Sequence, residues 1–356
     1  MKRVASRTLP TCFACLVLLA AYQEVLNGWS SYLAISPTSQ RLEQASRLTP
    51  LDSALLRQRG ILCLDTNPEA AANLLRMAVA MNPFDAESLI ALGLLKESGG
   101  RLEEAEAYLA KATSVSRRYK PKWALAFFYA RQGPLDKFWN SASSAANTEG
   151  ADVQSVFTLA HEVLNGDPDK VGSLLKLQSQ QSLKSYVEFL LKQESASSLF
   201  QIALRLDIAQ QSEPLILTVV DRLIAENKPE EAIPLWNKLA ATSGKHQLMP
   251  AKGQSLTNGK FRASVNRGFD WLHTENQGVD VYAAAPENLR IEFSGHQSES
   301  VTLLSQFVPV LPDRPYRLSY TYSTLGLNGL TGLYWQAFQE NKPATQRSAQ
   351  IGRAHV

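Results

Sequence analysis

The sequence predicts a multidomain protein in which an all-α repeat domain is followed by an all-β sandwich. Two observations carry this prediction. From about residue 36 to residue 244, apolar residues recur at spacings of three and four, with Pro and Gly at the breaks, as in amphipathic helices. After residue 245, apolar and polar residues alternate, as in half-buried strands. We therefore expect four segments: residues 1–35, 36–244, 245–350 and a short tail, 351–356.

The composition is that of a packed globular protein. Hydrophobic residues make up 45% of the chain and charged residues 19%, which excludes a largely disordered chain. The net charge is +3, and the basic residues are spread along the sequence, so no nucleic acid partner is expected. Cys12 and Cys15 lie in the first apolar run, which leaves Cys63 alone. We expect no disulfide framework and place Cys63 in the core.

The N-terminal segment, residues 1–35, resembles a signal sequence. Lys2, Arg3 and Arg7 precede an apolar run from Cys12 to Tyr22, and this order directs the following chain outward. We expect an uncleaved, single-pass anchor in the inner membrane, with the rest of the chain in the periplasm if the source is a Gram-negative bacterium. The run is shorter than the ~17–25 residues of a comfortable span, so a cleaved signal stays open, as does an amphipathic helix packed on the body.

The helical segment contains a repeat of 33 residues. Pro50 and Pro83 are 33 positions apart, and each lies ten residues before a glycine, Gly60 and Gly93. A fixed period of this length predicts helical hairpins that stack into a solenoid, because a single hairpin cannot bury its own apolar face.

These residues resemble the tetratricopeptide repeat. The segment after Pro83 matches that family well, and the segment after Pro50 is a poorer copy, with Arg59 in place of a leucine and one residue deleted. The positions that match the packing signature are Gly60, Ala71, Ala78, Leu89, Leu92, Gly93, Ala105, Leu109 and Ala112. The resemblance implies a solenoid with a surface for a protein partner, without a cofactor.

Large aromatic residues of the helical segment are expected to pack in its core. Trp123, Phe138, Trp139 and Trp236 lie in its later, more divergent hairpins. For each of them, core packing is favoured over a role as a binding hot spot.

The β segment is predicted from short alternating stretches separated by turns. Residues 289–294 and 316–322 alternate most clearly, which favours an antiparallel sandwich. The stretches Asn258-Gly259-Lys260-Phe261, Phe269-Asp270-Trp271, Gln306-Phe307-Val308 and Pro315-Tyr316-Arg317-Leu318 follow one another in an order that resembles the galactose-binding-like jelly roll, over about residues 247–338.

That resemblance implies a carbohydrate-binding fold. Sugar rings stack on exposed aromatic side chains, so we consider Trp271, Tyr322, Tyr334 and Trp335 as candidates for sugar stacking. The alternative is that these rings fill the core, and for Trp271 we favour it. Residues 351–356 read like a translated sequencing adapter, so we expect them to be non-native and the sandwich to be truncated.

No enzymatic motif is complete. His161-Glu162 begins like a zinc-protease motif, but Asn165 stands where the second histidine is needed. We therefore expect no catalytic or metal site. The leading hypothesis is a membrane-anchored periplasmic scaffold that binds proteins, with a role in envelope polysaccharide assembly or export. The alternatives are a carbohydrate-binding protein whose repeats act as a spacer, and a fragment of an enzyme.

Overall fold

The computed structural model describes residues 2–35, 38–148, 153–164, 168–193, 199–208, 212–243, 246–262, 266–284, 288–298, 301–325, 333–338 and 346–347. The chain forms two compact units. The first contains residues Met1–Met249 and Gln254–Val308, and the second contains Pro250–Gly253 and Pro309–Val356. No helix in the described part of the chain is both long enough and apolar enough to cross a membrane.

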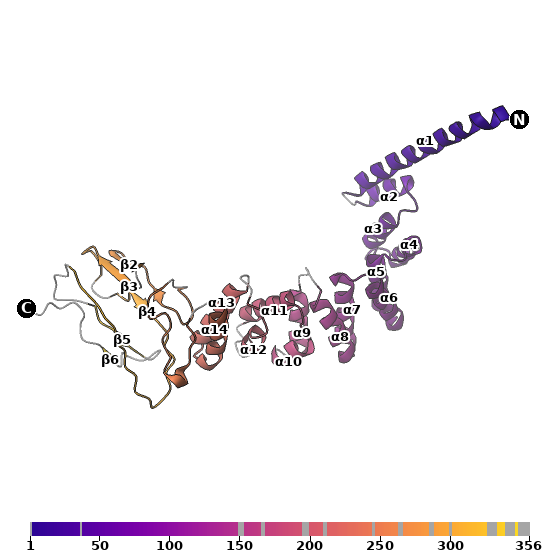
Figure 1. Ribbon diagram of the computed structural model, residues 1–356. Helices are drawn as coiled ribbons and strands as arrows, with labels where there is room; N and C mark the ends of the chain where they lie inside the picture. The colour runs from indigo at the N-terminus through magenta and orange to yellow at the C-terminus, as the bar shows by residue number, and fades with distance from the viewer. Residues whose placement is uncertain are drawn as a thin grey trace, which may run out of the picture. The chain divides into compact units, whose positions relative to one another are not determined.

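The first unit is built mainly from helices that follow one another as hairpins (Figure 1). The described helices are α1 (Lys2–Ala34), α2 (Ser39–Leu48), α3 (Ser53–Leu62), α4 (Pro68–Met81), α5 (Ala86–Ser98), α6 (Leu102–Val115), α7 (Tyr119–Gln132), α8 (Leu135–Ala146), α9 (Gln154–Val163), α10 (Pro168–Leu174), α11 (Gln180–Lys192), α12 (Leu199–Ala203), α13 (Glu213–Ala225) and α14 (Pro229–Ser243). Pairs α3/α4, α5/α6 and α7/α8 form the most extensive contacts, as expected for a solenoid of the tetratricopeptide type.

Local sequence explains where these helices begin. Asp52, Asn67 and Asp85 each precede a helix and accept a hydrogen bond from a backbone N–H of its first turn. Gly133 ends α7 in the left-handed conformation, at φ +95°, which glycine adopts without the steric cost of a Cβ. These four residues, which lie at or close to the Pro and Gly breaks predicted from the sequence, give the helix ends a local physical cause.

The hairpins are close-packed where the repeat signature requires it. A Cβ added to Gly60 would lie 2.8 Å from Leu75 Cγ and 3.4 Å from the Ala71 carbonyl oxygen. A Cβ on Gly93 would meet Leu109 Cγ at 2.7 Å. Only glycine lets the two helices of each hairpin approach this closely.

The C-terminal end of α1 packs on the helices that follow it. The Ser30 hydroxyl is buried and lies 2.7 Å from the Thr49 hydroxyl, just beyond α2. Leu33 and Ala34 pack on a cluster of Leu42, Ala45 and Leu55. Residues 30–34 therefore fold with the first hairpins. Cys63, which we placed in the core, is only partly buried, because it ends α3 at a helix C-terminus that faces solvent.

The predicted β-sandwich is not present in the described residues. Their strands form three separate antiparallel pairs: β1 (Leu272–His273) with β4 (Leu304–Ser305), β2 (Val279–Ala284) with β3 (Asn288–Phe293), and β5 (Gln336–Ala337) with β6 (Gln346–Arg347). The predicted strand at 289–294 corresponds to β3, paired in register with β2, Val279 opposite Phe293. Residues 316–322 form no strand. An alternating pattern becomes a strand only where a neighbour pairs with its backbone groups.

The junction after α14 is a packed interface within the first unit. Trp236 Nε1 donates to the His246 carbonyl oxygen at 3.2 Å, and the side chain of Asn237 exchanges two hydrogen bonds with the backbone of Leu248. Asp221 of α13 accepts from Arg267 Nε at 2.8 Å and from the Gly268 N–H at 2.7 Å. The change of pattern at residue 245 therefore falls inside a compact unit.

Candidate protein-binding face

Helices α3, α5 and α7 are the first helices of three successive hairpins, and each contacts the next. We call the surface that they share the first-helix face. Residues on neighbouring helices of this face are related by the 33-residue period, so equivalent positions form rows across the three helices. These rows are where a partner could contact several repeats at once.

One row of the first-helix face is apolar and open. It consists of Ile61, Leu94 and Phe127, which are 42%, 42% and 40% exposed. The spacing between them is 33 residues in both steps. Three large apolar side chains at equivalent positions with closely similar exposure indicate a continuous feature of the repeat and not scattered surface residues.

Aromatic rings extend this row along α7. Tyr119, Trp123 and Phe127 follow one another at four-residue spacing, with stacked rings whose centroids are 6.3 and 5.5 Å apart. The Arg131 guanidinium lies over the Phe127 ring, at 4.0 Å from its centroid. One side of α7 thus presents a ladder of rings that ends in a cation.

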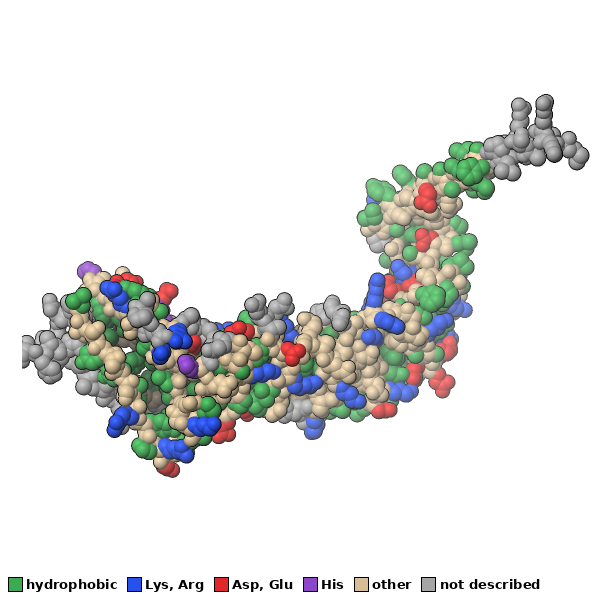
Figure 2. Space-filling view, viewed as in Figure 1, with side chains coloured by type: hydrophobic (Ala, Val, Ile, Leu, Met, Phe, Trp, Pro, Cys, Tyr) green, Lys and Arg blue, Asp and Glu red, His purple; other side chains and the backbone are tan. Residues whose placement is uncertain are grey.

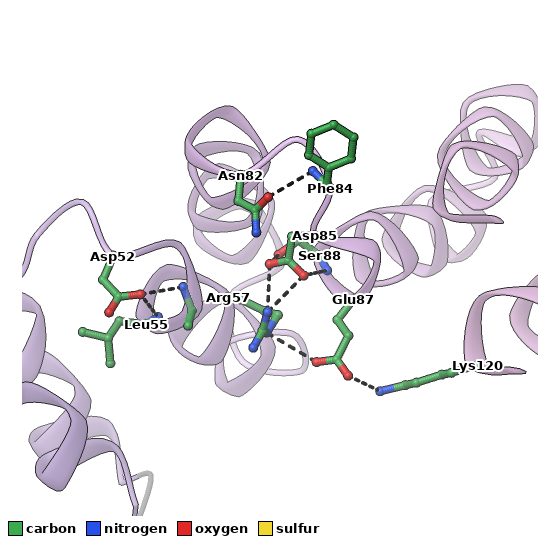
Figure 3. Close-up of polar contacts among 10 residues, drawn as sticks. Asp52, Leu55, Arg57, Asn82, Phe84, Asp85, Glu87, Ser88 and Lys120 are labelled. Atoms are coloured by element: carbon green, nitrogen blue, oxygen red, sulfur yellow. Dashed lines mark hydrogen bonds and ion pairs between the residues drawn. The ribbon is translucent and has the colours of Figure 1, made fainter. Parts of the chain in front are cut away.

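A network of ion pairs borders the first-helix face at the N-terminal ends of its helices (Figure 3). Arg57 donates from Nη1 to both carboxylate oxygens of buried Asp85, at 3.0 and 2.9 Å. Its Nε lies 3.4 Å from Glu87, which Lys120 approaches to 3.2 Å. Asp85 also accepts from the Ser88 hydroxyl at 2.9 Å. This network joins α3, α5 and α7 through their side chains.

A second group of ion pairs borders the other ends of α5 and α7. Glu97 accepts from Arg131 Nε at 2.9 Å and from Gln132 Nε2 at 3.0 Å. Arg131 therefore contacts both the carboxylate and the aromatic ladder. The apolar row lies between two charged borders, which is the arrangement of an interface with an apolar centre and a polar rim.

A polar triad joins α6, α7 and α8. Glu106 accepts from the Tyr129 hydroxyl at 2.8 Å and from Lys137 Nζ at 2.7 Å. The hydrogen bond from Lys137, followed by that from Tyr129, lowers the pKa of the Glu106 carboxyl. Burial, followed by the bond to Glu106, raises the pKa of Tyr129 well above its usual range. The triad fixes the successive hairpins against one another.

The nine positions of the repeat signature are all buried: Gly60, Ala71, Ala78, Leu89, Leu92, Gly93, Ala105, Leu109 and Ala112. They pack helix against helix and none lies on the open row. Phe138 and Trp236 are also in the core, whereas Trp123 and Trp139 are partly buried. Trp123 belongs to the aromatic ladder, so the expectation of core packing holds for it only in part.

The four candidates for sugar stacking lie in different surroundings. Trp271 is only 8% exposed, and its Nε1 donates to the Asn258 carbonyl oxygen at 3.0 Å. The structure therefore favours core packing for this ring. Tyr322, Tyr334 and Trp335 lie in the second unit, where Tyr320 contacts Tyr322 and Trp335 with ring centroids 6.1 and 5.9 Å apart. Tyr322 and Tyr334 are exposed.

The motif residues of the predicted jelly roll hold one another in place. Asn258 donates to Asp270 at 3.0 Å and accepts from the Arg262 N–H at 2.8 Å. Gln306 Nε2 donates to the Thr257 hydroxyl at 2.7 Å and to the Phe269 carbonyl oxygen at 2.8 Å. These side chains are thus engaged within the chain.

The histidine of the incomplete zinc-protease motif, His161, contacts other side chains of the helical segment. His161 Nε2 lies 3.1 Å from the Tyr186 hydroxyl, and the imidazole packs on the Phe189 ring at 5.0 Å. Burial lowers the pKa of His161. Within the described ranges, no group of three or more His, Cys, Asp or Glu side chains is arranged to hold a metal ion.

The nine signature positions, which are buried, were identified from the sequence, whereas the open row was not. Ile61, Leu94 and Phe127 are not signature positions, and their exposure cannot be deduced from hydrophobicity alone. The signal was present, however, because the same 33-residue period that relates the glycines also relates these three residues.

Comparison with known proteins finds similarity to solved structures alone. No protein-family model matches the chain, and no curated protein matches it. Among solved structures, a chain of Naa15/Naa10 bound to HypK-THB is 12% identical, with a TM-score of 0.31 over 64% of this chain and 37% of that one. YrrB, described as a TPR protein with an unusual peptide-binding site, is 12% identical, with a TM-score of 0.34 over 59% and 95%.

A third similar structure is PilF of Pseudomonas aeruginosa, which is 13% identical, with a TM-score of 0.28 over 63% of this chain and 91% of that one. The matched segment spans well under two thirds of the first of these chains. Similarity at this level assigns no function to the chain.

Proposed function

We propose that this protein is a non-catalytic scaffold whose first-helix face binds an apolar segment of a partner protein. The observation that carries the proposal is the row of Ile61, Leu94 and Phe127, which are similarly exposed and bordered by ion pairs. Contacts repeated over three helices add up along one ligand, which favours a linear segment over a compact small molecule.

The distance between neighbouring helices of the row suggests which linear segments could bind to it. Helices in direct contact lie about 8–10 Å apart. A polyproline II segment rises about 9 Å in three residues, so apolar side chains at every third position would follow the row. A helical segment rises about 10 Å in seven residues and would match with a heptad spacing.

A displayed library of linear peptides tests the proposal. Peptides selected on the full chain are measured against the variants Leu94→Gln and Phe127→Gln, with Leu102→Gln as the control. Leu102 has the same 42% exposure as Leu94 but lies on α6, outside the first-helix face. We expect about tenfold weaker binding for the two face variants, because each removes apolar contact area, and no change for the control. Equal binding by all variants would contradict the proposal.

The second part of the proposal concerns location and pathway. We infer that the N-terminal helix contacts the inner membrane with the repeats in the periplasm, supported by the basic residues that precede the apolar run. A role in envelope polysaccharide assembly or export is proposed from the combination of this segment, a repeat face and exposed aromatic rings. Fractionation of the expressing cells into membrane, periplasm and cytosol tests the location.

Carbohydrate binding is a second candidate function, favoured by the aromatic cluster of Tyr320, Tyr322 and Trp335. Rings that contact one another and stay partly open can stack on the C–H face of a sugar. A glycan array probed with the full chain and with Tyr322→Ala and Trp335→Ala tests this function. Tyr282→Ala, an exposed tyrosine of β2, is the control. Binding that survives all three substitutions, or no binding by the parent chain, would remove this candidate.

A further inference from the structure

Helix α1 is apolar on every side over part of its length. All residues from Phe13 to Tyr22 are apolar in the sequence. The described large side chains among them are 51–70% exposed, and Figure 2 shows hydrophobic side chains over the described part of this helix. A protein partner covers one side of a helix, whereas a helix that sinks into the headgroup and acyl boundary of a membrane has lipid on more than one side. Open apolar residues on several sides of this segment therefore fit contact with a membrane surface.

An open apolar stripe continues beyond this segment on one side of α1. Leu18, Tyr22, Val25, Trp29 and Tyr32 follow one another at spacings of four and three, which keeps them on one side of a helix. They are 60–70% exposed, and the rings of Trp29 and Tyr32 lie 5.9 Å apart. We call these five residues the outer stripe.

The other sides of this part of α1 have different surroundings. Gln23, Glu24 and Asn27 make the side away from the outer stripe polar. Ser30 follows Trp29 by one residue and therefore points about 100° round the helix, toward α2, where it bonds Thr49. Residues 22–32 thus have one apolar, one polar and one packed side, and α2 leaves the outer stripe uncovered.

We propose that α1 lies along a phospholipid surface, with the outer stripe in the interfacial region and the first hairpins held beside the membrane. Trp and Tyr suit this region because their rings are apolar and their N–H and O–H groups reach water. The basic residues Lys2, Arg3 and Arg7 complement an anionic surface. If α1 instead entered the membrane perpendicular to its surface, with Tyr22 at the edge of the hydrocarbon, Trp29 would lie about 10 Å beyond Tyr22 and outside the hydrocarbon. The inference rests on the proposed membrane contact.

The test uses the full chain and vesicles of phosphatidylcholine and phosphatidylglycerol at a ratio of about 3:1, chosen for their anionic surface. Tryptophan emission is recorded with lipids brominated on the acyl chain, for the parent protein and for Trp29→Phe. We expect co-sedimentation with the vesicles and quenching of an emission component that disappears in Trp29→Phe. The double variant Trp29→Gln/Tyr32→Gln should bind about tenfold more weakly.

Phe84→Gln is the matched control, because Phe84 is 74% exposed in the loop before α5 and outside α1. If the protein binds vesicles but no quenching depends on Trp29, the proposed orientation of α1 along the surface is wrong, whereas the proposed membrane contact remains supported. No vesicle binding would overturn both and leave the peptide-binding face untouched. A dimer in lipid-free solution that the double variant dissociates, without vesicle binding, would show that a second copy covers the stripe.

Discussion

Leu109 packs so closely on Gly93 that a Cβ at residue 93 would lie 2.7 Å from its Cγ. We expect Gly93→Ala to lower the free energy of unfolding by roughly 1–2 kcal/mol, because the overpacking cost exceeds the gain in helix propensity. Urea denaturation measures the change. Gly28→Ala is the control, since nothing lies within 4 Å of a Cβ at that helical position. A stabilised Gly93→Ala protein would show that the hairpin opens without cost.

The carboxylate of Asp85 forms stabilising contacts with two helices. It begins α5 as its N-cap and pairs with Arg57 of α3. We expect Asp85→Ala to cost about 2–3 kcal/mol, because the cap is lost and the partly buried guanidinium of Arg57 loses its buried partner and keeps only the more exposed Glu87. Glu43→Ala, which removes an exposed pair with Arg47 within α2, should change stability by less than about 0.5 kcal/mol. Equal effects in urea denaturation would contradict this role of Asp85.

Asp221 holds the segment after α14 against α13. Asp221→Ala removes the acceptor for Arg267 and for the Gly268 N–H. We expect amide hydrogen exchange in residues 266–271 to become about tenfold faster or more, because a lost hydrogen bond to a charged group costs about 1.5–3 kcal/mol. Asp280→Ala, on the exposed side of β2, should leave these amides unchanged. Unchanged exchange in Asp221→Ala would mean that other contacts hold the segment, among them the ring contact between Trp236 and Phe269 and the hydrogen bond from Gln306 to the Phe269 carbonyl oxygen.

His161 should make stability depend on pH. Its pKa is lowered in the folded protein, so between this lowered pKa and about pH 6.5 the unfolded chain binds more protons at this residue than the folded one does. The free energy of unfolding therefore falls as pH decreases from about 7 through the folded pKa. His161→Gln should reduce this slope, measured by urea denaturation between about pH 7.5 and 5.5. His296→Gln, in an exposed turn, is the control. The same slope in both variants would exclude this role.

The helical half could be predicted from sequence because its signals are local or periodic. Capping residues such as Asp52 and Asn67 act within a few positions of themselves. The glycines at 60 and 93 mark close approach of two helices that are neighbours in the chain, so the period alone identifies them. The residues that pack the hairpins of the first-helix face were predicted for the same reason.

The β segment was harder to predict, since strands depend on partners far away in the sequence. The pattern at 289–294 became β3 because β2 pairs with it, whereas 316–322 alternates equally well and forms no strand. The attachment of residues 246–248 to α14 and of residues 267–268 to α13 was also missed, because Asp221 and Arg267 are 46 positions apart and carry no local signature.

The sequence by itself determined the repeat, its period of 33 and the residues that pack its hairpins. Only the tertiary structure decided which apolar residues stay open. Ile61, Leu94 and Phe127 are as hydrophobic as the buried leucines beside them, and their exposure follows from the stacking of α3, α5 and α7. It likewise decided that Ser30 is covered by α2 while Trp29, one residue earlier, is open. Burial depends on which elements meet, and that information lies in the fold as a whole.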